Sequence, residues 1–167
     1  SCTMSPMSDS HHIRLGIIGF GSWAVNAYLP AITKTPDVEV VAAAGRSEAT
    51  QNAARAALGR GALITSDFQE LLDPGVIDAV MIAVTEDQHA VTIGAAVASG
   101  LPVFYEPPLS DRRDQLHSEI ERLSSAHQIT HADLELSYLP VVDHVAALIS
   151  AGAIGTPHGA SVTMTSG

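Results

Sequence analysis

The chain has 167 residues, enough for one domain with a sizeable core or for one domain and the beginning of another. Apolar residues make up 46% of it and charged residues 16%, a composition that excludes an intrinsically disordered protein. Its 18 acidic and 8 basic residues give a formal charge of -10 without a basic patch, so we expect no binding to nucleic acid or to anionic membranes.

The first segment, residues 1–12, has the composition of a flexible polar leader. It contains the lone Cys2, so the chain can form no internal disulfide, and a His11-His12 pair that is typical of solvated histidines rather than of a metal site. The leader lacks the pattern of a secretion signal, and no apolar run of the chain reaches the roughly 18 residues that span a bilayer. These features predict a cytoplasmic protein.

A glycine turn follows the leader and organises the rest of the chain. Apolar residues of strand length in Ile13–Ile18 lead into Gly19-Phe20-Gly21, and an apolar helical pattern runs from Trp23 to Thr33. The third small position of the GxGxxA pattern is Ala24. Strand, glycine turn and helix together are typical of a site where helix N–H groups face a pyrophosphate.

The following segments alternate between strand and helix patterns. The expected strands are 38–44, 62–65, 76–84, 101–105 and 129–136, and the expected helical segments are 67–72, 48–58, 90–99 and 111–127. This alternation predicts right-handed crossovers and an α/β fold with a doubly wound parallel sheet, the Rossmann class. We therefore expect a dinucleotide-binding Rossmann domain over residues 13–136 and the beginning of a second α+β domain over residues 137–167.

In such a sheet the ligand lies beyond the carboxyl ends of the strands, so the polar residues after each strand carry the chemistry. Gly45-Arg46-Ser47 follows the second expected strand, where an acidic residue would bind the ribose 2′-hydroxyl of NAD. Arg46 and Ser47 offer a guanidinium and a hydroxyl instead, which suit a 2′-phosphate. The sequence thus predicts NADP, with NAD less favoured.

The order of motifs resembles the glucose-fructose oxidoreductase, inositol dehydrogenase and MocA (Gfo/Idh/MocA) family. Its first domain carries a glycine loop, a strand that reads like Asp-Ala-Val-x-Ile-Ala-Thr, a helix that begins near a His, and then Glu-Lys-Pro. The matching parts here are Gly19-Phe20-Gly21, Asp78 to Thr85, His89, and Glu106-Pro107-Pro108-Leu109. Tyr138-Leu139-Pro140 and Gly152-Ala153-Ile154-Gly155 resemble the family's passage into its second domain.

The resemblance implies roles for individual residues of the crevice. The loop Gly19, Phe20, Gly21, Ser22 and Trp23 would hold the pyrophosphate, with Arg46 and Ser47 at the adenosine ribose phosphate. Thr85 and His89 would flank the nicotinamide, and Glu106 would lie near its ribose. The family oxidises or reduces a hydroxyl or carbonyl carbon of sugars, inositols and related small polar molecules with NAD(P).

Two departures from the family pattern weaken this expectation. Pro107 stands where the family has the lysine of Glu-Lys-Pro, and proline has neither charge nor donor. The sequence also ends at Gly167, after the first expected strand of the second sheet, Gly159–Thr165, so we expect a short or truncated member. An unpaired strand there predicts a homo-oligomer that pairs this segment with another copy.

A last feature comes from the residues alone. His131, Asp133 and Glu135 alternate with apolar residues in the expected strand 129–136, which places three ionisable groups on one face. They form either an ordinary polar face or, on a covered face, an acid-base group or metal ligands. We assign no metal site. The candidate catalytic residues are Glu106, His89, His131, Asp133, Glu135 and Tyr138.

Three functions remain open at this stage. The first is an NADP(H)-dependent oxidoreductase that acts on a sugar-like or other small polar substrate. The second is a dinucleotide-binding or interaction module that has lost catalysis, which the replacement of the lysine favours. The third is a non-redox enzyme that reuses the crevice for acid-base chemistry, since fold alone does not choose among these.

Overall fold

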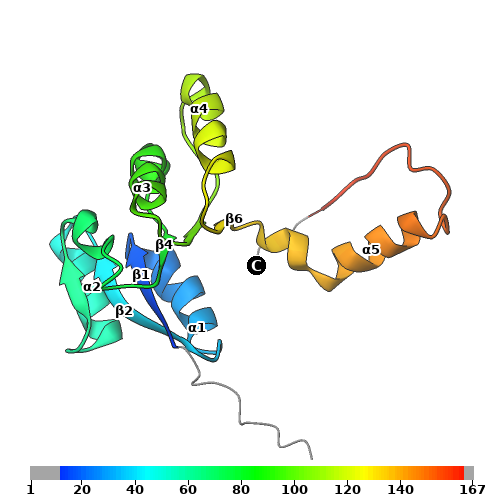
Figure 1. Cartoon of the computed structure of the whole chain (residues 1–167). Helices are drawn as coiled ribbons and strands as arrows, with labels where there is room; N and C mark the ends of the chain where they lie inside the picture. Colours follow the sequence, from blue (N-terminus) through cyan, green and yellow to red (C-terminus); the bar gives the residue numbers. More distant parts are fainter. Residues whose placement is uncertain (1–11, 164–167) are drawn as a thin grey trace, which may run out of the picture. The chain divides into compact units, whose positions relative to one another are not determined.

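The computed structural model describes residues 12–163, and within them six parallel strands form one sheet in the order β3-β2-β1-β4-β5-β6 (Figure 1). The strands are β1 (Ile13–Ile18), β2 (Val38–Ala44), β3 (Leu63–Thr65), β4 (Ala79–Ile82), β5 (Val103–Tyr105) and β6 (Thr130–Ala132). After β3 the chain returns to the middle of the sheet and places β4 beside β1, so the strand order reverses between β1 and β4. The predicted doubly wound α/β fold is confirmed.

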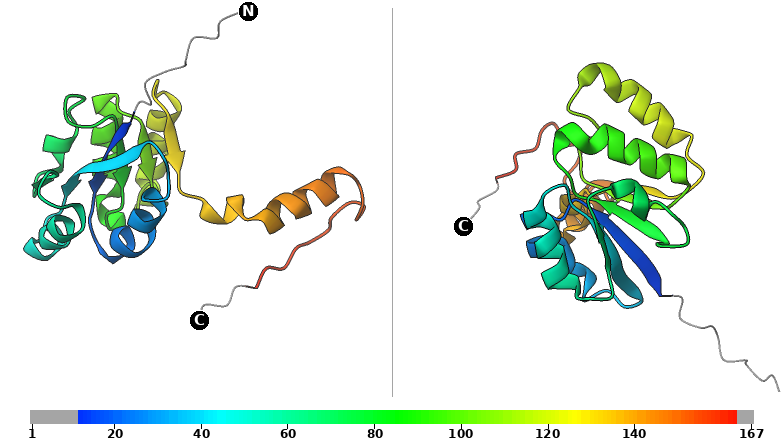
Figure 2. Two further views of the ribbon diagram at one scale, coloured as in Figure 1. Left: turned by 90° about the horizontal axis from the view of Figure 1, so that it is seen from below. Right: turned by 90° about the vertical axis from the view of Figure 1, so that its left-hand side faces the viewer.

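Helices cover both faces of this sheet. The π-helix η1 (Ala24–Tyr28) continues into α1 (Leu29–Ile32) and lies with α2 (Glu48–Leu58) on one face, while α3 (Glu86–Ser99) and α4 (Arg113–Ser124) lie on the other (Figure 2). The short 3-10 helix η2 (Phe68–Leu71) follows β3. The predicted helix over residues 23–33 is present, with a π-helical turn in its middle.

Two apolar cores result from the alternation of side chains along the strands. Ile17 faces one core with Tyr28 and Ala54, and Ile18 faces the other with Ile93. Both isoleucines are at most 2% exposed, so β1 is buried on both faces. A continuous apolar run in the sequence is the signature of such a strand, which explains why β1 and β2 could be predicted with little error.

The most apolar stretch of the chain forms a shorter strand than predicted. β4 covers Ala79–Ile82, whereas the sequence predicts a strand over residues 76–84. Asp73 closes a turn before it, because its carbonyl accepts from the N–H groups of Val76 and Ile77. Ile77 is nevertheless fully buried. Apolar composition marks burial in this segment and does not distinguish a strand from a buried turn.

Two further boundaries differ from the expectations. α3 begins at Glu86 rather than at residue 90, with Thr85 extended at its N-cap, because Glu86 and Asp87 interact favourably with the N-terminal dipole. β6 ends at Ala132, whereas the predicted strand runs to residue 136. The expected single face of His131, Asp133 and Glu135 is therefore wrong, since Glu135 belongs to a 3-10 helix.

A separate compact unit begins at Leu134, next to the boundary expected at residue 136. It contains the 3-10 helix η3 (Glu135–Tyr138) and α5 (Pro140–Ser150). Residues 159–163 form no strand, and the rest of the expected strand Gly159–Thr165 lies outside the described residues. A strand requires a pairing partner, and none is present among residues 134–163. The homo-oligomer predicted through this segment stays a prediction.

No helix among residues 12–163 combines the length and the apolar composition that crossing a bilayer requires.

Candidate functional site

The first glycine of the turn is required by the fold itself. Gly19 has a φ of +91°, and a Cβ there would lie 2.2 Å from the carbonyl oxygen of Ala83, directly after β4. Its N–H donates to the Ala44 carbonyl at the end of β2. Gly19 therefore allows the ends of three neighbouring strands to approach closely, as expected for the tight turn of a Rossmann domain.

At the second glycine of the turn, Gly21, no contact with the described residues requires the absence of a side chain. Gly21 has no atom within 4 Å of the position of a Cβ, and its φ is not positive. Its carbonyl accepts from the N–H of Val25, so the helix begins directly after it. The first turn of a helix offers N–H groups without partners in that helix. An open surface without a side chain at this place fits a bound pyrophosphate.

The other residues of the predicted loop divide into two groups. Ser22 and Trp23 are exposed, and the Trp23 ring contacts Tyr28 edge to face at a centroid distance of 6.4 Å. Phe20 and Ala24 are each 1% exposed and belong to the core. Phe20 can thus offer a ligand only its main chain, whereas Ala24 allows the helix to pack closely on the sheet.

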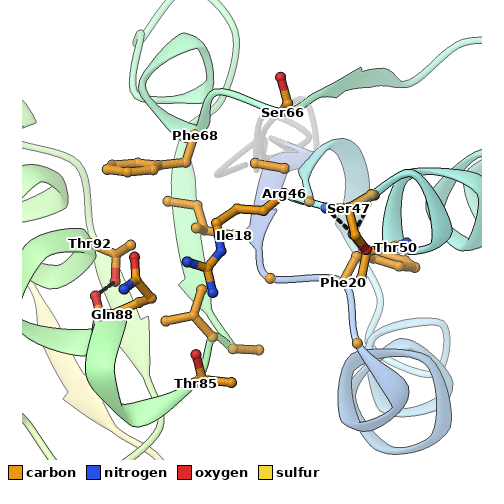
Figure 3. A pocket seen from close by; sticks show the side chains of 16 residues that line it. Ile18, Phe20, Arg46, Ser47, Thr50, Ser66, Phe68, Thr85, Gln88 and Thr92 are labelled. Carbon is orange, nitrogen blue, oxygen red and sulfur yellow. Dashed lines mark hydrogen bonds between the residues drawn. The ribbon is translucent and has the colours of Figure 1, made fainter. Parts of the chain in front are cut away.

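A cavity of about 250 Å³ opens beside the loop. Its walls come from the segments that follow β1, β2, β3 and β4, together with the start of α3. Figure 3 shows the side chain of Arg46 pointing into this cavity, on the side of Gln88. Arg46 makes no hydrogen bond or salt bridge to another residue among those the structure describes, so its guanidinium is available to an anion.

The end of β2 excludes the acidic residue that would favour NAD. A Cβ on Gly45 would lie 2.5 Å from the Thr50 hydroxyl oxygen. That hydroxyl is held in place by a capping box, in which Ser47 Oγ accepts from the Thr50 N–H at 3.2 Å and the Thr50 hydroxyl accepts from the Ser47 N–H at 3.3 Å. Ser47 thus caps α2 beside the cavity, and position 45 has no space for a carboxylate.

A second cavity, of about 590 Å³, adjoins the first, because Val84 and Thr85 line both. Its remaining lining residues follow β4 and β5, among them His89, Glu106 and Pro107. The two cavities form a crevice along the carboxyl edge of the sheet. Of the predicted site residues, this crevice brings together Gly19, Phe20, Gly21, Arg46, Ser47, Thr85, His89 and Glu106.

His89 is buried, with 1% of its surface exposed. Its Nε2 lies 3.1 Å from the Val84 carbonyl oxygen, and its Nδ1 contacts the Pro108 carbonyl oxygen. The ring therefore connects the segment after β4 to the segment after β5, and both nitrogens are engaged by the main chain. In this arrangement His89 holds together two segments of the crevice wall. Its predicted catalytic role stays a prediction.

A tyrosine that the sequence did not single out lies next to Glu106. Tyr28, 8% exposed, donates its hydroxyl proton to Asp133 Oδ2 at 2.6 Å. A hydroxyl has one proton, so the neighbouring Glu106 carboxylate receives none, and its buried Oε1 has no hydrogen-bond partner among the described residues. Tyr28 has no sequence signal of its own, because Glu106 and its hydrogen-bond partner Asp133 are 78 and 105 positions away.

Two of the remaining candidates, His131 and Asp133, belong to the sheet domain and line neither cavity. The His131 ring stacks on Phe104 at a centroid distance of 5.5 Å, and Asp133 is the partner of Tyr28. Glu135 and Tyr138 belong to the unit that begins at Leu134. No three His, Cys, Asp or Glu side chains among residues 12–163 gather closely enough to hold a metal ion.

Two further residues of the crevice wall were not predicted from the sequence. Ser66 and Phe68 line the first cavity directly after β3. The rule that ligands lie beyond the carboxyl ends of parallel strands would have indicated both, had it been applied to the third strand.

The environment of Tyr28 predicts an effect on stability. Burial, followed by the carboxylates of Asp133 and Glu106, raises the pKa of Tyr28. The folded chain thus keeps a proton that the unfolded chain loses above about pH 10, and stability falls as the pH rises beyond that value. We expect Tyr28→Phe to cost about 1.5–3 kcal/mol at neutral pH, through the lost bond to a carboxylate, and to reduce the alkaline loss.

Urea unfolding at neutral pH and at about pH 10.5 measures both effects. The matched control is Tyr138→Phe, since the Tyr138 ring is 65% exposed. Equal stability changes in the two variants would contradict the assigned role of the Tyr28–Asp133 pair.

The sheet, the glycine turn at its carboxyl edge and the crevice at the reversal of strand order define a dinucleotide-binding Rossmann domain. More particularly, the chain belongs to the oxidoreductase family with an NAD-binding Rossmann fold, GFO_IDH_MocA, whose family model matches residues 13–134. The resemblance inferred from the motifs is confirmed.

Three proteins similar to this chain are longer than it. The chain is 30% identical over 158 residues to dTDP-3,4-didehydro-2,6-dideoxy-alpha-D-glucose 3-reductase of Streptomyces violaceoruber, which covers 92% of this chain and 44% of the reductase. Among solved structures it is similar to a 3-ketoreductase from Actinomadura kijaniata in complex with TDP-benzene and NADP, with 26% identity and a TM-score of 0.71 over 84% of this chain and 44% of that one.

A third likeness concerns the fold alone. The scyllo-inositol dehydrogenase from Lactobacillus casei, with bound NAD(H) and scyllo-inositol, has 23% identity and a TM-score of 0.77 over 86% of this chain and 42% of that chain. The present chain thus spans less than half of the length of these proteins.

Proposed function

We propose that the chain is the cofactor-binding part of an NADP(H)-dependent oxidoreductase that acts on a hydroxyl or carbonyl carbon of a sugar-like substrate. The observation that carries the cofactor choice is Arg46, which points into the first cavity without a hydrogen bond or salt bridge to the described residues, beside a Gly45 that leaves no space for a carboxylate. A guanidinium binds a 2′-phosphate through paired charge-assisted hydrogen bonds.

The substrate class is supported by the relatives. The Streptomyces violaceoruber reductase is named for a dTDP-linked deoxysugar, and the Lactobacillus casei dehydrogenase was solved with scyllo-inositol. In the proposed reaction the cofactor supplies or accepts a hydride. The chain's own residues bind the pyrophosphate at Gly21, hold the 2′-phosphate at Arg46 and offer Glu106 as a proton acceptor at the second cavity.

Pro107 favours a second candidate function. The family position of a charged lysine is occupied here by a side chain with no proton to give, which supports a dinucleotide-binding module without catalysis. A non-redox acid-base enzyme at Glu106 is the third candidate. All three candidates use the same crevice.

Three measurements with the probe substrates scyllo-inositol and D-glucose separate these functions: absorbance at 340 nm in the presence of NADP+, calorimetric binding of NADP+, and product analysis of the probes without NADP+. The proposal expects NADPH formation with at least one polyol or sugar. Cofactor binding without turnover of any probe would favour the module, and conversion of a probe without NADP+ would favour the non-redox enzyme.

A further inference from the structure

The crevice changes its charge from one end to the other. The first cavity contains the guanidinium of Arg46. The adjoining second cavity is lined by four carboxylates and by no lysine or arginine; these carboxylates belong to Glu86, Asp87, Glu106 and Asp111. A ligand that spans the crevice thus meets a cation at one end and anions at the other.

The cations around the second cavity compensate this charge only in part. Hydrogen bonds from Thr85 and Gln88, and more weakly the charge of Arg46, lower the pKa of Asp87, which keeps this group ionised. Arg112 lies near Asp111, but its salt bridge is with Asp114 at 2.7 Å. Among the residues that the structure describes, none forms a salt bridge with a carboxylate of this cavity.

Glu106 differs from the other three carboxylates in having a buried oxygen without a hydrogen-bond donor. The hydroxyl that could donate to it, on Tyr28, donates to Asp133 instead, and Glu106 Oε1 remains buried without a donor. The imidazole of His89 lines the same cavity, yet both of its ring nitrogens face main-chain carbonyls of Val84 and Pro108. Pro107, the next residue of the chain, adds no charge.

Strand order indicates which half of a dinucleotide meets these carboxylates. Arg46 follows β2, on one side of the reversal between β1 and β4, and Glu106 follows β5, on the other side. A dinucleotide crosses a Rossmann sheet at this reversal, with one nucleotide on each side. With the 2′-phosphate at Arg46, the nicotinamide half faces β4 and β5, where the acidic cavity lies.

We propose that the acidic cavity makes the chain bind oxidised NADP+ more tightly than reduced NADPH, with Glu106 as the main determinant. The nicotinamide ring of NADP+ carries a positive charge, whereas the ring of NADPH is neutral, and the rest of the two molecules is alike. A carboxylate near the ring stabilises the cation and gives the neutral ring no such gain. This inference rests on the proposed function, since it requires a bound nicotinamide cofactor.

Calorimetric titration of the wild-type chain and of Glu106→Gln with NADP+ and with NADPH tests the proposal. The amide keeps the size of the side chain and removes its charge. We expect the wild type to prefer NADP+ and the substitution to weaken NADP+ about fivefold while NADPH stays within about twofold. The preference should also decline as salt is added, because salt screens charges in an open crevice.

Two substitutions at one position supply the matched comparison. Pro107→Lys adds a cation at the rim of the cavity, and Pro107→Gln makes a similar change of backbone and size without the charge. We expect the lysine to reduce the preference for NADP+ several-fold and the glutamine to leave it in place. Since Pro107 is exposed, this pair keeps the test valid even if Glu106→Gln were to fold poorly.

The possible failures are distinguishable. If the wild type binds neither cofactor, the proposed function is wrong. A second failure is that the wild type binds both cofactors but the ratio of the two affinities does not change in Pro107→Lys, nor in Glu106→Gln where that variant folds. In that case the cofactor site stands and the proposed charge preference is overturned.

Discussion

Gly19→Ala is expected to destabilise the Rossmann domain by about 3 kcal/mol, through a strained backbone and a crowded core. Its φ of +91° is costly for any residue with a Cβ, and the added methyl group would meet the main-chain carbonyl of Ala83 at 2.2 Å. A backbone atom of a central loop cannot move aside as the end of a flexible side chain can. Urea unfolding followed by circular dichroism measures the change.

The matched control lies two residues further along the chain. Gly21→Ala adds the same methyl group at a position with no atom within 4 Å, so we expect its urea midpoint to remain close to that of the wild type. Its effect should appear in cofactor binding, because the methyl group occupies the surface assigned to the pyrophosphate. Similar losses of stability in the two variants, or undiminished cofactor binding by Gly21→Ala, would contradict the separate roles assigned to these glycines.

The second large effect is expected at Arg46. Removal of a charge-assisted, two-pronged contact to a phosphate costs about 1.5–3 kcal/mol, so Arg46→Ala should weaken NADPH binding by roughly 10- to 150-fold. NADH lacks the 2′-phosphate, and its affinity should change by less than about threefold. Quenching of Trp23, the single tryptophan of the chain, offers a convenient readout beside the loop.

Arg60→Ala is the control for a general loss of positive charge, because Arg60 is exposed and lies outside both cavities. It should leave the affinities for NADPH and NADH nearly unchanged. If Arg46→Ala weakened the two cofactors equally, the assignment of Arg46 to the 2′-phosphate would be wrong.

The parts of the fold that were predictable depend on short stretches of chain. Strand, glycine turn and helix are neighbours in sequence, so the pattern around Gly19 and Gly21 was sufficient to predict the pyrophosphate loop. Arg46 was indicated in the same way, since it directly follows a buried strand at the ligand edge of the sheet. Periodicity and turn residues were sufficient at these positions, and the structure places both features in one cavity.

The parts that were missed depend on contacts distant in sequence. The Tyr28–Asp133 pair joins residues 105 positions apart, and neither has a local signal for the other. His89 was predicted as a crevice residue, but its contact with the Pro108 carbonyl comes from the packing of α3 against the segment after β5. The end of β6 was missed because alternating residues predict a strand only where a neighbour pairs with it, and pairing with β5 stops at Ala132.

The measurement that tests the account most directly is a calorimetric titration of the unmodified chain with NADP+ and NAD+ up to about 1 mM, a range that detects any affinity useful to an enzyme. The arrangement of Gly21 and Arg46 predicts saturable binding of one NADP+ per chain, with NAD+ at least tenfold weaker. Absence of saturable binding for both cofactors would contradict the dinucleotide site, and tighter binding of NAD+ than of NADP+ would contradict the role of Arg46.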